Sequence, residues 1–400
     1  MTDSKTRTRL AVLTTLVAAS ALLVPAFNAL GATSGAPQPA SGDGGFAALA
    51  TTTTRTTTTR TTTRTTTTTR TSTRTSTTGT RTTTTGTRTT TTSSLPGTPT
   101  TTTPGLAYGT PDGYAALNTL GSNGVTGGLG GPVITVSTTD ELLAAIDTVG
   151  PLVIQVSGKI GITSKQGVRP NKSIIGLGSN AEITGGGFDF YKSYNVMVRN
   201  LHFSAADDDS VNIGQNSHHI WIDHNTFTAA ADGSVDIVRG SDYITVSWNH
   251  FDHTDKTMLI GHSDSNASED TGHLKVSIHH NWFDGGKQRH PRVRFGEPVH
   301  VYNNFYSDNS LYGVASVMNA GVVVEGNYFE NNPFPVYSTS GYADSGPGRA
   351  VVRNNVFVNS GPAEANGSVA EPSSYYSYTL DDPNTVPAKV RAGAGAGVVS

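Results

Sequence analysis

Cysteine is absent from the 400 residues of the chain. A disulfide framework, thiol catalysis and any cysteine-ligated metal site are therefore excluded. The fold must instead be held by a sizeable apolar core and by hydrogen bonds. Long hydrophobic runs are also scarce: after residue 24, no segment has the roughly 20 consecutive apolar residues that a membrane-spanning helix needs.

The first 32 residues are typical of a secretory signal peptide. Lys5, Arg7 and Arg9 precede the apolar run Leu10–Val24, and small residues follow it. A short membrane anchor is the alternative, but the run is shorter than a spanning helix. We therefore expect removal of residues 1–32, a secreted, extracellular protein, and no membrane partner after that removal.

Apolar side chains are rare in residues 33–104, and from Thr51 to Thr103 the chain is almost entirely threonine with spaced arginines. Such a segment cannot bury enough surface to offset the entropy lost on ordering. We interpret it as a disordered linker. O-glycosylation, or binding of an acidic polysaccharide by the arginines, are additional hypotheses.

Basic side chains are scarce in the remainder of the chain. Residues 105–400 hold 17 basic and 28 acidic side chains, whereas residues 1–104 hold ten basic and two acidic ones. An acidic domain binds polyanions poorly unless positive charge is concentrated locally. We therefore expect no nucleic-acid partner.

An internal repeat runs through residues 195–360. Short β-rich segments recur, and each closes on an asparagine followed by an aromatic residue, as in residues 220–227, 244–251 and 276–283. The closing asparagines are Asn225, Asn249, Asn281, Asn304, Asn327 and Asn355, with separations of 24, 32, 23, 23 and 28 residues. A period in the low twenties predicts a solenoid, with insertions in the two longer coils.

We predict that residues 105–400 form one all-β domain, a single-stranded parallel β-helix. Its asparagines would form a ladder at left-handed turns, and its aromatic side chains would stack inside. A leucine-rich repeat lacks support because its leucine and helix pattern is missing, and a propeller needs roughly 40–45 residues per unit. Residues 140–148 predict a short N-terminal capping helix, with Asp140 or a preceding threonine as its cap. We expect residues 361–400 to pack along the flank.

Two acidic stretches one coil apart suggest a metal site. Asp232 and Asp236 are four residues apart, so they face the same side of a strand. Asp209, and with it Asp207, would lie one coil below. Carboxylates this close repel unless a cation lies among them, and oxygen ligands alone favour Ca²⁺. A solvated acidic turn is the alternative, and the choice among Asp207, Asp208 and Asp209 stays open.

The basic stretch of residues 287–296 contains Arg289 and Arg294. Strand alternation would separate the two, but Pro291 interrupts the strand. A nucleic-acid patch is the rival interpretation, and the acidity of the domain argues against it. Arginine binds carboxylates in a bidentate manner, so calcium and arginine together would suit a polyuronate. Lys256 would add a third positive contact.

Twelve histidines include the pairs His218-His219 and His279-His280. Adjacent residues of a strand point to opposite faces, so we expect neither pair to share one zinc ion. We interpret most of these histidines as turn or stacking residues.

Five segments together are similar to polysaccharide lyase family 1, the pectate lyases, in the order of that family. They are Trp221–His224, Asp232–Ile237, Val246–Asn249, Lys256–His262 and Arg289–Gly296. The resemblance spans roughly residues 105–400. It implies a right-handed β-helix and a secreted, calcium-dependent lyase, expected as a monomer. Such an enzyme cleaves α-1,4-linked polygalacturonate by β-elimination and leaves 4,5-unsaturated ends.

The resemblance also implies a role for each matching residue. The calcium ligands would be Asp209, Asp232 and Asp236, with Asp207 as an accessory position; Lys256 and Arg294 would bind substrate, and Arg289 would be the catalytic base. Free arginine is a poor base because its pKa lies above about 12. The base role therefore rests on the resemblance, and it predicts an alkaline activity optimum.

Three rival functions remain at this point. A pectin lyase would share the fold but would not need the acidic cluster, and a β-helical polygalacturonase would hydrolyse with paired carboxylates. A non-catalytic wall-binding protein is suggested by the threonine- and arginine-rich segment. Substrate methylation, product unsaturation and release of oligosaccharides distinguish these functions.

Overall fold

The computed structural model describes residues 108–342 and 345–399. The predicted signal peptide (1–32) and linker (33–104) lie outside the described residues. Within the described ranges, no helix combines the length and the apolar character that crossing a membrane requires.

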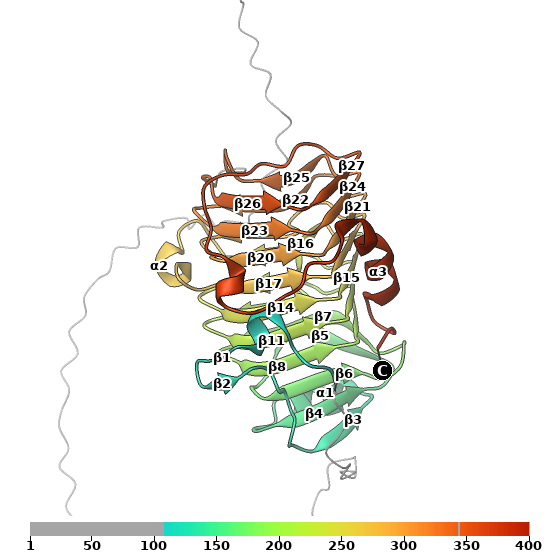
Figure 1. Cartoon of the computed structure of the whole chain (residues 1–400). Helices are drawn as coiled ribbons and strands as arrows, with labels where there is room; N and C mark the ends of the chain where they lie inside the picture. The colour runs from blue at the N-terminus through green and yellow to red at the C-terminus, as the bar shows by residue number, and fades with distance from the viewer. Residues whose placement is uncertain (1–107, 343–344, 400) are drawn as a thin grey trace, which may run out of the picture. The chain divides into compact units, whose positions relative to one another are not determined.

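The described chain winds into a parallel β-solenoid built from two large sheets (Figure 1). One sheet has ten parallel strands, each from a successive coil. In spatial order these are β3 (Val133–Val136), β4 (Leu152–Val156), β6 (Lys172–Gly176), β8 (Tyr194–Arg199), β11 (His218–Asp223), β14 (Asp242–Ser247), β17 (Val276–His279), β20 (Val299–Tyr302), β23 (Gly321–Glu325) and β26 (Arg349–Arg353).

The second sheet has fifteen strands and divides into two arms at β7 (Glu182–Tyr191), which also pairs with β5 (Lys159–Gly167). The first arm holds β10 (Val211–Gly214), β13 (Gly233–Ile237), β16 (Lys256–Ile260), β19 (Arg292–Arg294), β22 (Tyr312–Val317) and β25 (Phe334–Tyr337). The second arm holds β9 (His202–Ser204), β12 (Thr226–Thr228), β15 (His250–Asp252), β18 (Trp282–Asp284), β21 (Phe305–Ser307), β24 (Tyr328–Glu330) and β27 (Val356–Val358). A full coil thus contributes three strands: one to the ten-stranded sheet and one to each arm of the fifteen-stranded sheet.

The predicted asparagine ladder is confirmed. The amide Nδ2 of Asn225 donates to Oδ1 of Asn249, and the same bond repeats through Asn281, Asn304 and Asn327 to Asn355, at 3.0–3.1 Å. The prediction that these asparagines adopt left-handed backbone angles is wrong. The residue before each one takes the positive φ, for example His224 at 52° and Trp248 at 54°. The ladder residue itself can then turn its amide inward.

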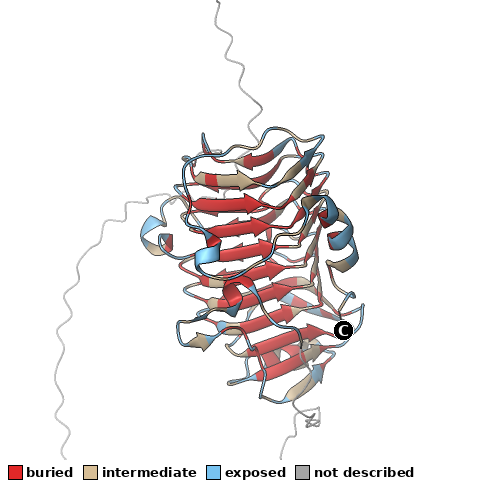
Figure 2. Ribbon diagram, in the orientation of Figure 1, coloured by how far each residue is buried: buried red, intermediate tan, exposed pale blue. Residues whose placement is uncertain are grey.

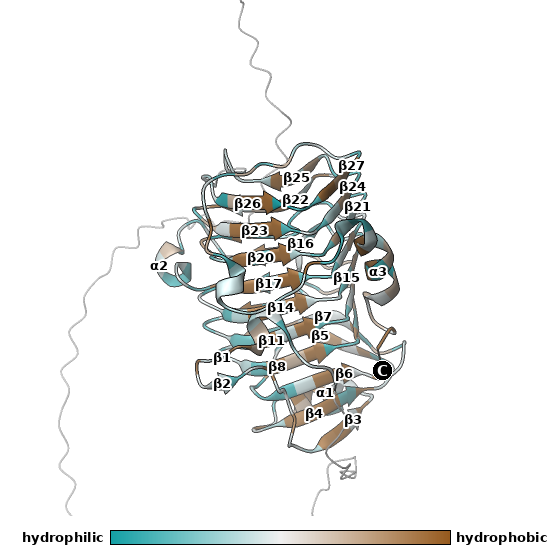
Figure 3. Cartoon of the chain, in the orientation of Figure 1, coloured by the Kyte–Doolittle hydropathy of each residue, from teal (hydrophilic) through white to brown (hydrophobic). Residues whose placement is uncertain are grey.

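Aromatic and aliphatic columns fill the interior, as predicted. Rings stack from coil to coil at centroid distances of 4.3–5.2 Å, in the order Phe203, Phe227, Phe251, Phe283, Tyr306, Phe329 and Phe357. The ribbons of the ten-stranded sheet are coloured largely as buried and, in many places, as hydrophobic (Figures 2 and 3). A β-branched or aromatic side chain at every second position suits this stacking.

Helix α1 (Thr139–Ile146) forms at the predicted place and packs against β3, β4 and β5. The side chain of Thr138 accepts from the backbone of Glu141, and the Glu141 carboxylate accepts from the backbone of Thr138, which makes a capping box. Leu142 and Ile146 are buried. That α1 caps the solenoid, and that the solenoid is right-handed, stay predictions.

Several short helices and one hairpin lie outside the two large sheets. They are η1 (Gly113–Ala116), the hairpin β1 (Asn118–Thr119) and β2 (Ser122–Asn123), α2 (Ala267–Asp270), η2 (Pro372–Ser374), η3 (Pro383–Thr385) and α3 (Val386–Gly393). Helix α2 lies in the coil with the 32-residue separation, as an insertion. The C-terminal segment runs along the flank, where Val386 and Val390 of α3 pack on Phe305.

The histidine pairs correct one step of the sequence argument. The Nδ1 atoms of His218 and His219 lie 2.8 Å apart, and those of His279 and His280 lie 2.9 Å apart. Strand alternation fails because His219 and His280 take positive φ angles of 53° and 54°, which turn each second ring toward the first. The predicted stacking holds, since His280 stacks on Trp248.

Candidate active site

Five of the seven predicted site residues lie at or just before the N-terminal ends of β10, β13, β16 and β19, which are neighbours in one arm. Asp207 and Asp209 precede β10, Asp232 precedes β13, Lys256 opens β16 and Arg289 precedes β19. Asp236 lies within β13 and Arg294 ends β19. Parallel stacking therefore brings together residues that are far apart in the sequence.

Three carboxylates form the acidic centre of the site. Asp208, Asp209 and Asp232 each offer an oxygen atom, and these atoms lie within 4.8 Å of one another. The backbone N–H of Asp232 donates to the carbonyl of Asp208, because the two residues occupy equivalent places in successive coils. Asp207 lies outside this group, although it adjoins it in the sequence.

Asp236 lies beside Asp209 beneath the backbone of Gly233. A Cβ atom at Gly233 would lie 2.5 Å from Oδ1 of Asp236 and 2.9 Å from Oδ1 of Asp209, so a side chain there would displace one of the two carboxylates. Burial, together with the charge of Asp209, raises the pKa of Asp236 well above its ordinary value. Burial also raises the pKa of Asp209. These are carboxylates whose negative charge a cation would stabilise.

Lys165 of β5 contributes a cation that the sequence argument missed. Its Nζ lies 2.7 Å from Oδ2 of Asp208 and 2.7 Å from Oδ2 of Asp209. Burial works against the charge of Lys165, but its hydrogen bonds to the two carboxylates outweigh burial and raise the pKa of Lys165 above its ordinary value. Lys165 precedes the repeat that the sequence revealed, so no spacing pointed to it.

Two further cations converge on Asp232. Nζ of Lys256 lies 2.9 Å from Oδ1 of Asp232, and Nη1 of Arg289 lies 3.8 Å from the same oxygen. The Arg289 side chain is only 10% exposed. Its backbone has a φ of 63°, which is strained for a residue with a side chain, while its carbonyl accepts from the N–H of Met258 at 2.7 Å. The strained turn thus holds Arg289 at the edge of the acidic centre.

Arg294 is held by a contact that the sequence did not predict. Its Nε donates to Oδ1 of Asp264 at 2.6 Å, and its Nη1 donates to the carbonyl of Gly261 at 3.1 Å. Oδ1 of Asp264 also accepts from Ser345 Oγ at 2.8 Å, and Ser345 Oγ accepts from Nη2 of Arg292 at 2.7 Å. Arg292 is thus linked to Arg294 through Ser345 and Asp264.

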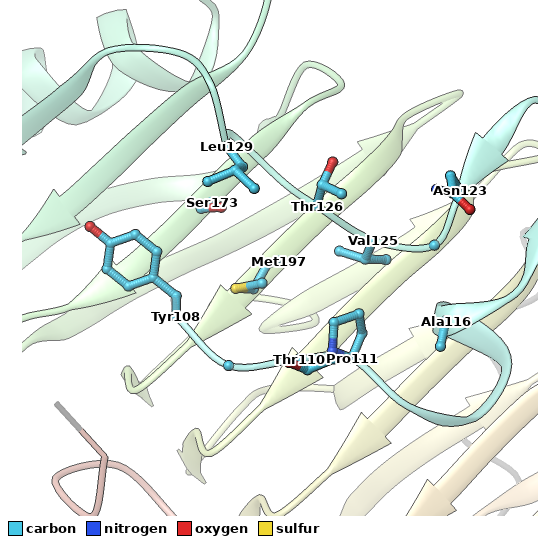
Figure 4. A pocket seen from close by; sticks show the side chains of 12 residues that line it. Tyr108, Thr110, Pro111, Ala116, Asn123, Val125, Thr126, Leu129, Ser173 and Met197 are labelled. Atoms are coloured by element: carbon cyan, nitrogen blue, oxygen red, sulfur yellow. The ribbon is translucent and has the colours of Figure 1, made fainter. Parts of the chain in front are cut away.

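A hollow of about 380 Å³ lies elsewhere, where the segment from Tyr108 to Leu129 crosses the ten-stranded sheet (Figure 4). Its lining is mainly apolar and includes Val125, Leu129 and Met197. It shares no residue with the acidic centre, so we do not assign the chemistry to it.

Comparison with known proteins agrees with this geometry. The sequence matches the pectate lyase family over residues 90–397. The chain belongs to the pectate lyase family. It is 37% identical to a pectate trisaccharide-lyase of Bacillus licheniformis over 307 residues, covering 72% of this chain and 86% of that one. It is 39% identical to pectate lyase A of Emericella nidulans over 293 residues, covering 71% and 85%.

A solved structure supports the same conclusion. A pectate lyase from Bacillus sp. N165 in complex with trigalacturonate superimposes with a TM-score of 0.64 and 31% identity, covering 72% of this chain and 99% of that one. The protein is therefore a polysaccharide lyase of the pectate lyase type, and the family predicted from the five segments is confirmed.

Proposed function

We propose that this lyase is secreted, needs calcium and cleaves α-1,4-linked polygalacturonate by β-elimination to give 4,5-unsaturated oligogalacturonides. The observation that carries the proposal is the convergence of Lys256 and Arg289 on Asp232 within the acidic centre. A polyuronate carries a carboxylate on every sugar. The protein's cations can pair with these substrate carboxylates directly, and its own carboxylates can hold a metal ion that attracts them. The name of the solved relative, bound to trigalacturonate, supports the substrate.

The donor set of the acidic centre fits calcium. Its donors are all carboxylate oxygens, and the Gly233 backbone leaves room between Asp209 and Asp236. Ca²⁺ prefers several oxygen ligands in a flexible arrangement. Asp209, Asp232 and Asp236 would hold the ion, and the grouping of Asp208 with Asp209 and Asp232 supports Asp208 over Asp207 as the accessory carboxylate. The chemistry that calcium would supply there is positive charge, which stabilises the negative charge of a substrate carboxylate.

Arg289 is the proposed base. In its neutral form it takes the proton from the carbon next to the uronate carboxylate, and that C–H electron pair forms a double bond to the neighbouring carbon. The glycosidic oxygen leaves with the C–O electron pair and takes a proton from solvent water. A guanidinium loses a proton only where burial and neighbouring positive charge disfavour the cation. The Arg289 side chain is only 10% exposed, and Lys256 pairs with the same Asp232 oxygen that Arg289 faces.

Lys256 and Arg294 are the proposed substrate-binding cations. Lys256 opens a strand beside Asp232, so its ammonium can pair with a uronate carboxylate and with the charge that develops there during proton removal. Asp264 fixes the Arg294 guanidinium before substrate arrives, which lowers the entropy lost on binding.

An absorbance assay tests the proposal directly. Unsaturated uronate ends absorb in the ultraviolet, so purified protein should raise the absorbance of a polygalacturonate solution. A calcium chelator should abolish the rise and added Ca²⁺ should restore it. Saturated products would instead indicate a polygalacturonase, and faster cleavage of methylated pectin would indicate a pectin lyase. Binding without product release would indicate a wall-binding protein.

A further inference from the structure

A second group of metal-binding side chains lies on the other arm of the fifteen-stranded sheet. His250, Asp252 and Asp284 each offer a ligand atom, and these atoms lie within 4.8 Å of one another. The three residues come from the adjacent strands β15 and β18, where Asp252 is the direct cross-strand partner of Asp284. The group shares no residue with the acidic centre.

A second histidine borders this group through Asp252. Nδ1 of His253 lies 2.5 Å from Oδ1 of Asp252, and the backbone N–H of His253 donates to the carbonyl of Asp284 at 2.8 Å. Gly285 makes room for this ring, since a Cβ there would lie 2.7 Å from Nε2 of His253. One imidazole and two carboxylates therefore meet between two coils, and a second imidazole contacts one of the carboxylates.

Neighbouring side chains hold His250 and Asp284 in position. The ring of His250 stacks on Trp282 at a centroid distance of 4.3 Å. Nε1 of Trp282 donates to Ser307 Oγ at 2.8 Å, and Ser307 Oγ donates to Oδ1 of Asp284 at 3.0 Å. Oδ2 of Asp284 remains directed at Nε2 of His250, 3.2 Å away. Outer hydrogen bonds of this kind orient the ligands of metal sites.

We propose that His250, Asp252, His253 and Asp284 bind a divalent transition metal of the zinc class, independently of the proposed calcium site. Imidazole nitrogens with carboxylate oxygens suit Zn²⁺, whereas the all-oxygen acidic centre suits Ca²⁺. The ion would join the coil of β15 to the coil of β18. In this chain without cysteine, the ion would stabilise the solenoid because it binds only the folded state.

Calorimetry with zinc chloride tests this proposal. Untagged, chelator-stripped protein should bind one Zn²⁺ per chain at this group, and excess Ca²⁺ should not displace it. Zinc should raise the Tm, and Co²⁺ in its place should give the visible absorption of a low-coordinate ion. Asp252→Asn and His253→Gln replace the more exposed ligands, so these variants should fold and bind Zn²⁺ at least about tenfold more weakly. Ser307→Ala should weaken binding roughly ten- to hundredfold by releasing Asp284.

His202→Gln is the matched control, because His202 lies two coils away in the same column of β-strand positions. It should leave zinc binding unchanged. The proposal is overturned if the wild-type protein shows no saturable zinc binding, or if Asp252→Asn and His253→Gln bind as the wild type does. In that event the group consists of two histidine–aspartate ion pairs. Lyase activity is not the readout, so this result is separate from any failure of the proposed function.

Discussion

Nζ of Lys165 lies 2.7 Å from Oδ2 of Asp209, although 44 residues separate the two in the sequence. Gly187 of β7 is the cross-strand partner of Lys165 and has no side chain to interpose. The lysine can therefore reach across β7 to the acidic centre. Its ammonium balances part of the charge that Asp208, Asp209 and Asp232 concentrate there.

Replacing Lys165 should destabilise the protein most when calcium is withheld. Lys165→Met removes the ammonium and leaves the carboxylates to repel, so we expect a loss of roughly 3 kcal/mol in the free energy of unfolding measured in chelator. Added Ca²⁺ should restore much of this loss. Lys159→Met is the control on the same strand, because Lys159 pairs with Glu182 at a 59% exposed position and should cost under about 1 kcal/mol. Equal losses in the two variants would contradict the role of Lys165.

Arg289→Lys should keep substrate binding yet lose nearly all turnover. The variant keeps a positive charge near Asp232 but withdraws the proposed base, so kcat should fall by at least about 100-fold with little change in KM. Initial rates of absorbance increase on polygalacturonate measure this. Arg169→Lys, at a half-exposed site paired with Asp147, should behave as the wild type. The activity of the wild-type enzyme should also be highest at alkaline pH. If Arg289→Lys kept its turnover, Arg289 would not be the base.

Asp264 should act as a positioning residue for Arg294. Asp264→Ala frees the guanidinium, so we expect kcat/KM to fall about tenfold, mainly through KM. The Tm should fall as well, because the nearly buried Arg294 guanidinium loses its carboxylate partner. Asp264→Asn keeps an oxygen acceptor for Nε and should recover part of the loss. The exposed Asp140→Asn serves as a control. If both Asp264 variants matched the wild type in KM, the contact would have no part in binding.

The asparagine ladder should be a major source of stability. The buried amide of Asn281 donates to the carbonyls of Val246 and His279 and to Oδ1 of Asn304, and its own oxygen accepts from Asn249. Asn281→Ala would leave several buried partners without hydrogen bonds, which costs about 3 kcal/mol or more. Chemical denaturation measures the change. Asn180→Ala, at an exposed site whose φ is not positive, should cost under about 1 kcal/mol; similar losses at both sites would argue against the ladder.

Glu325 should make the fold sensitive to acid. Burial raises its pKa, but hydrogen bonds from His300, Arg353 and Tyr378 outweigh burial and lower the pKa from 4.5 to about 2. Because the pKa of Glu325 is lower in the folded state, its ionised carboxylate stabilises the folded state above pH 4.5. This contribution is lost as the pH falls toward 2. The full contribution is on the order of 3 kcal/mol.

The measurement is the free energy of unfolding of wild type and Glu325→Gln between pH 7 and pH 3. The difference between the two proteins should shrink as the pH falls. Glu330→Gln, which removes a half-buried carboxylate on the same coil, should show a smaller and flatter difference. If the difference in free energy of unfolding between wild type and Glu325→Gln stayed constant with pH, Glu325 would not be the source of the acid sensitivity.

The sequence by itself determined the repeat. Asn225 and Asn249 recur at coil spacing with Phe227 and Phe251 two places later, and this pattern predicted both the ladder and the interior stack. It also placed Asp209 and Asp232 one coil apart. Such features follow from local periodicity, because a parallel solenoid converts a sequence period directly into a column in space.

Only the tertiary structure decided the contacts made by residues that lie outside the sequence repeat. Lys165 lies before the recognisable repeat, and Asp264 lies in an insertion, so neither has a periodic position from which its partner could be read. The facing rings of His218 and His219 depend on a left-handed backbone angle that side-chain alternation does not reveal. Long flexible side chains and irregular turns are fixed by what packs around them, and that packing exists only once the coils have stacked.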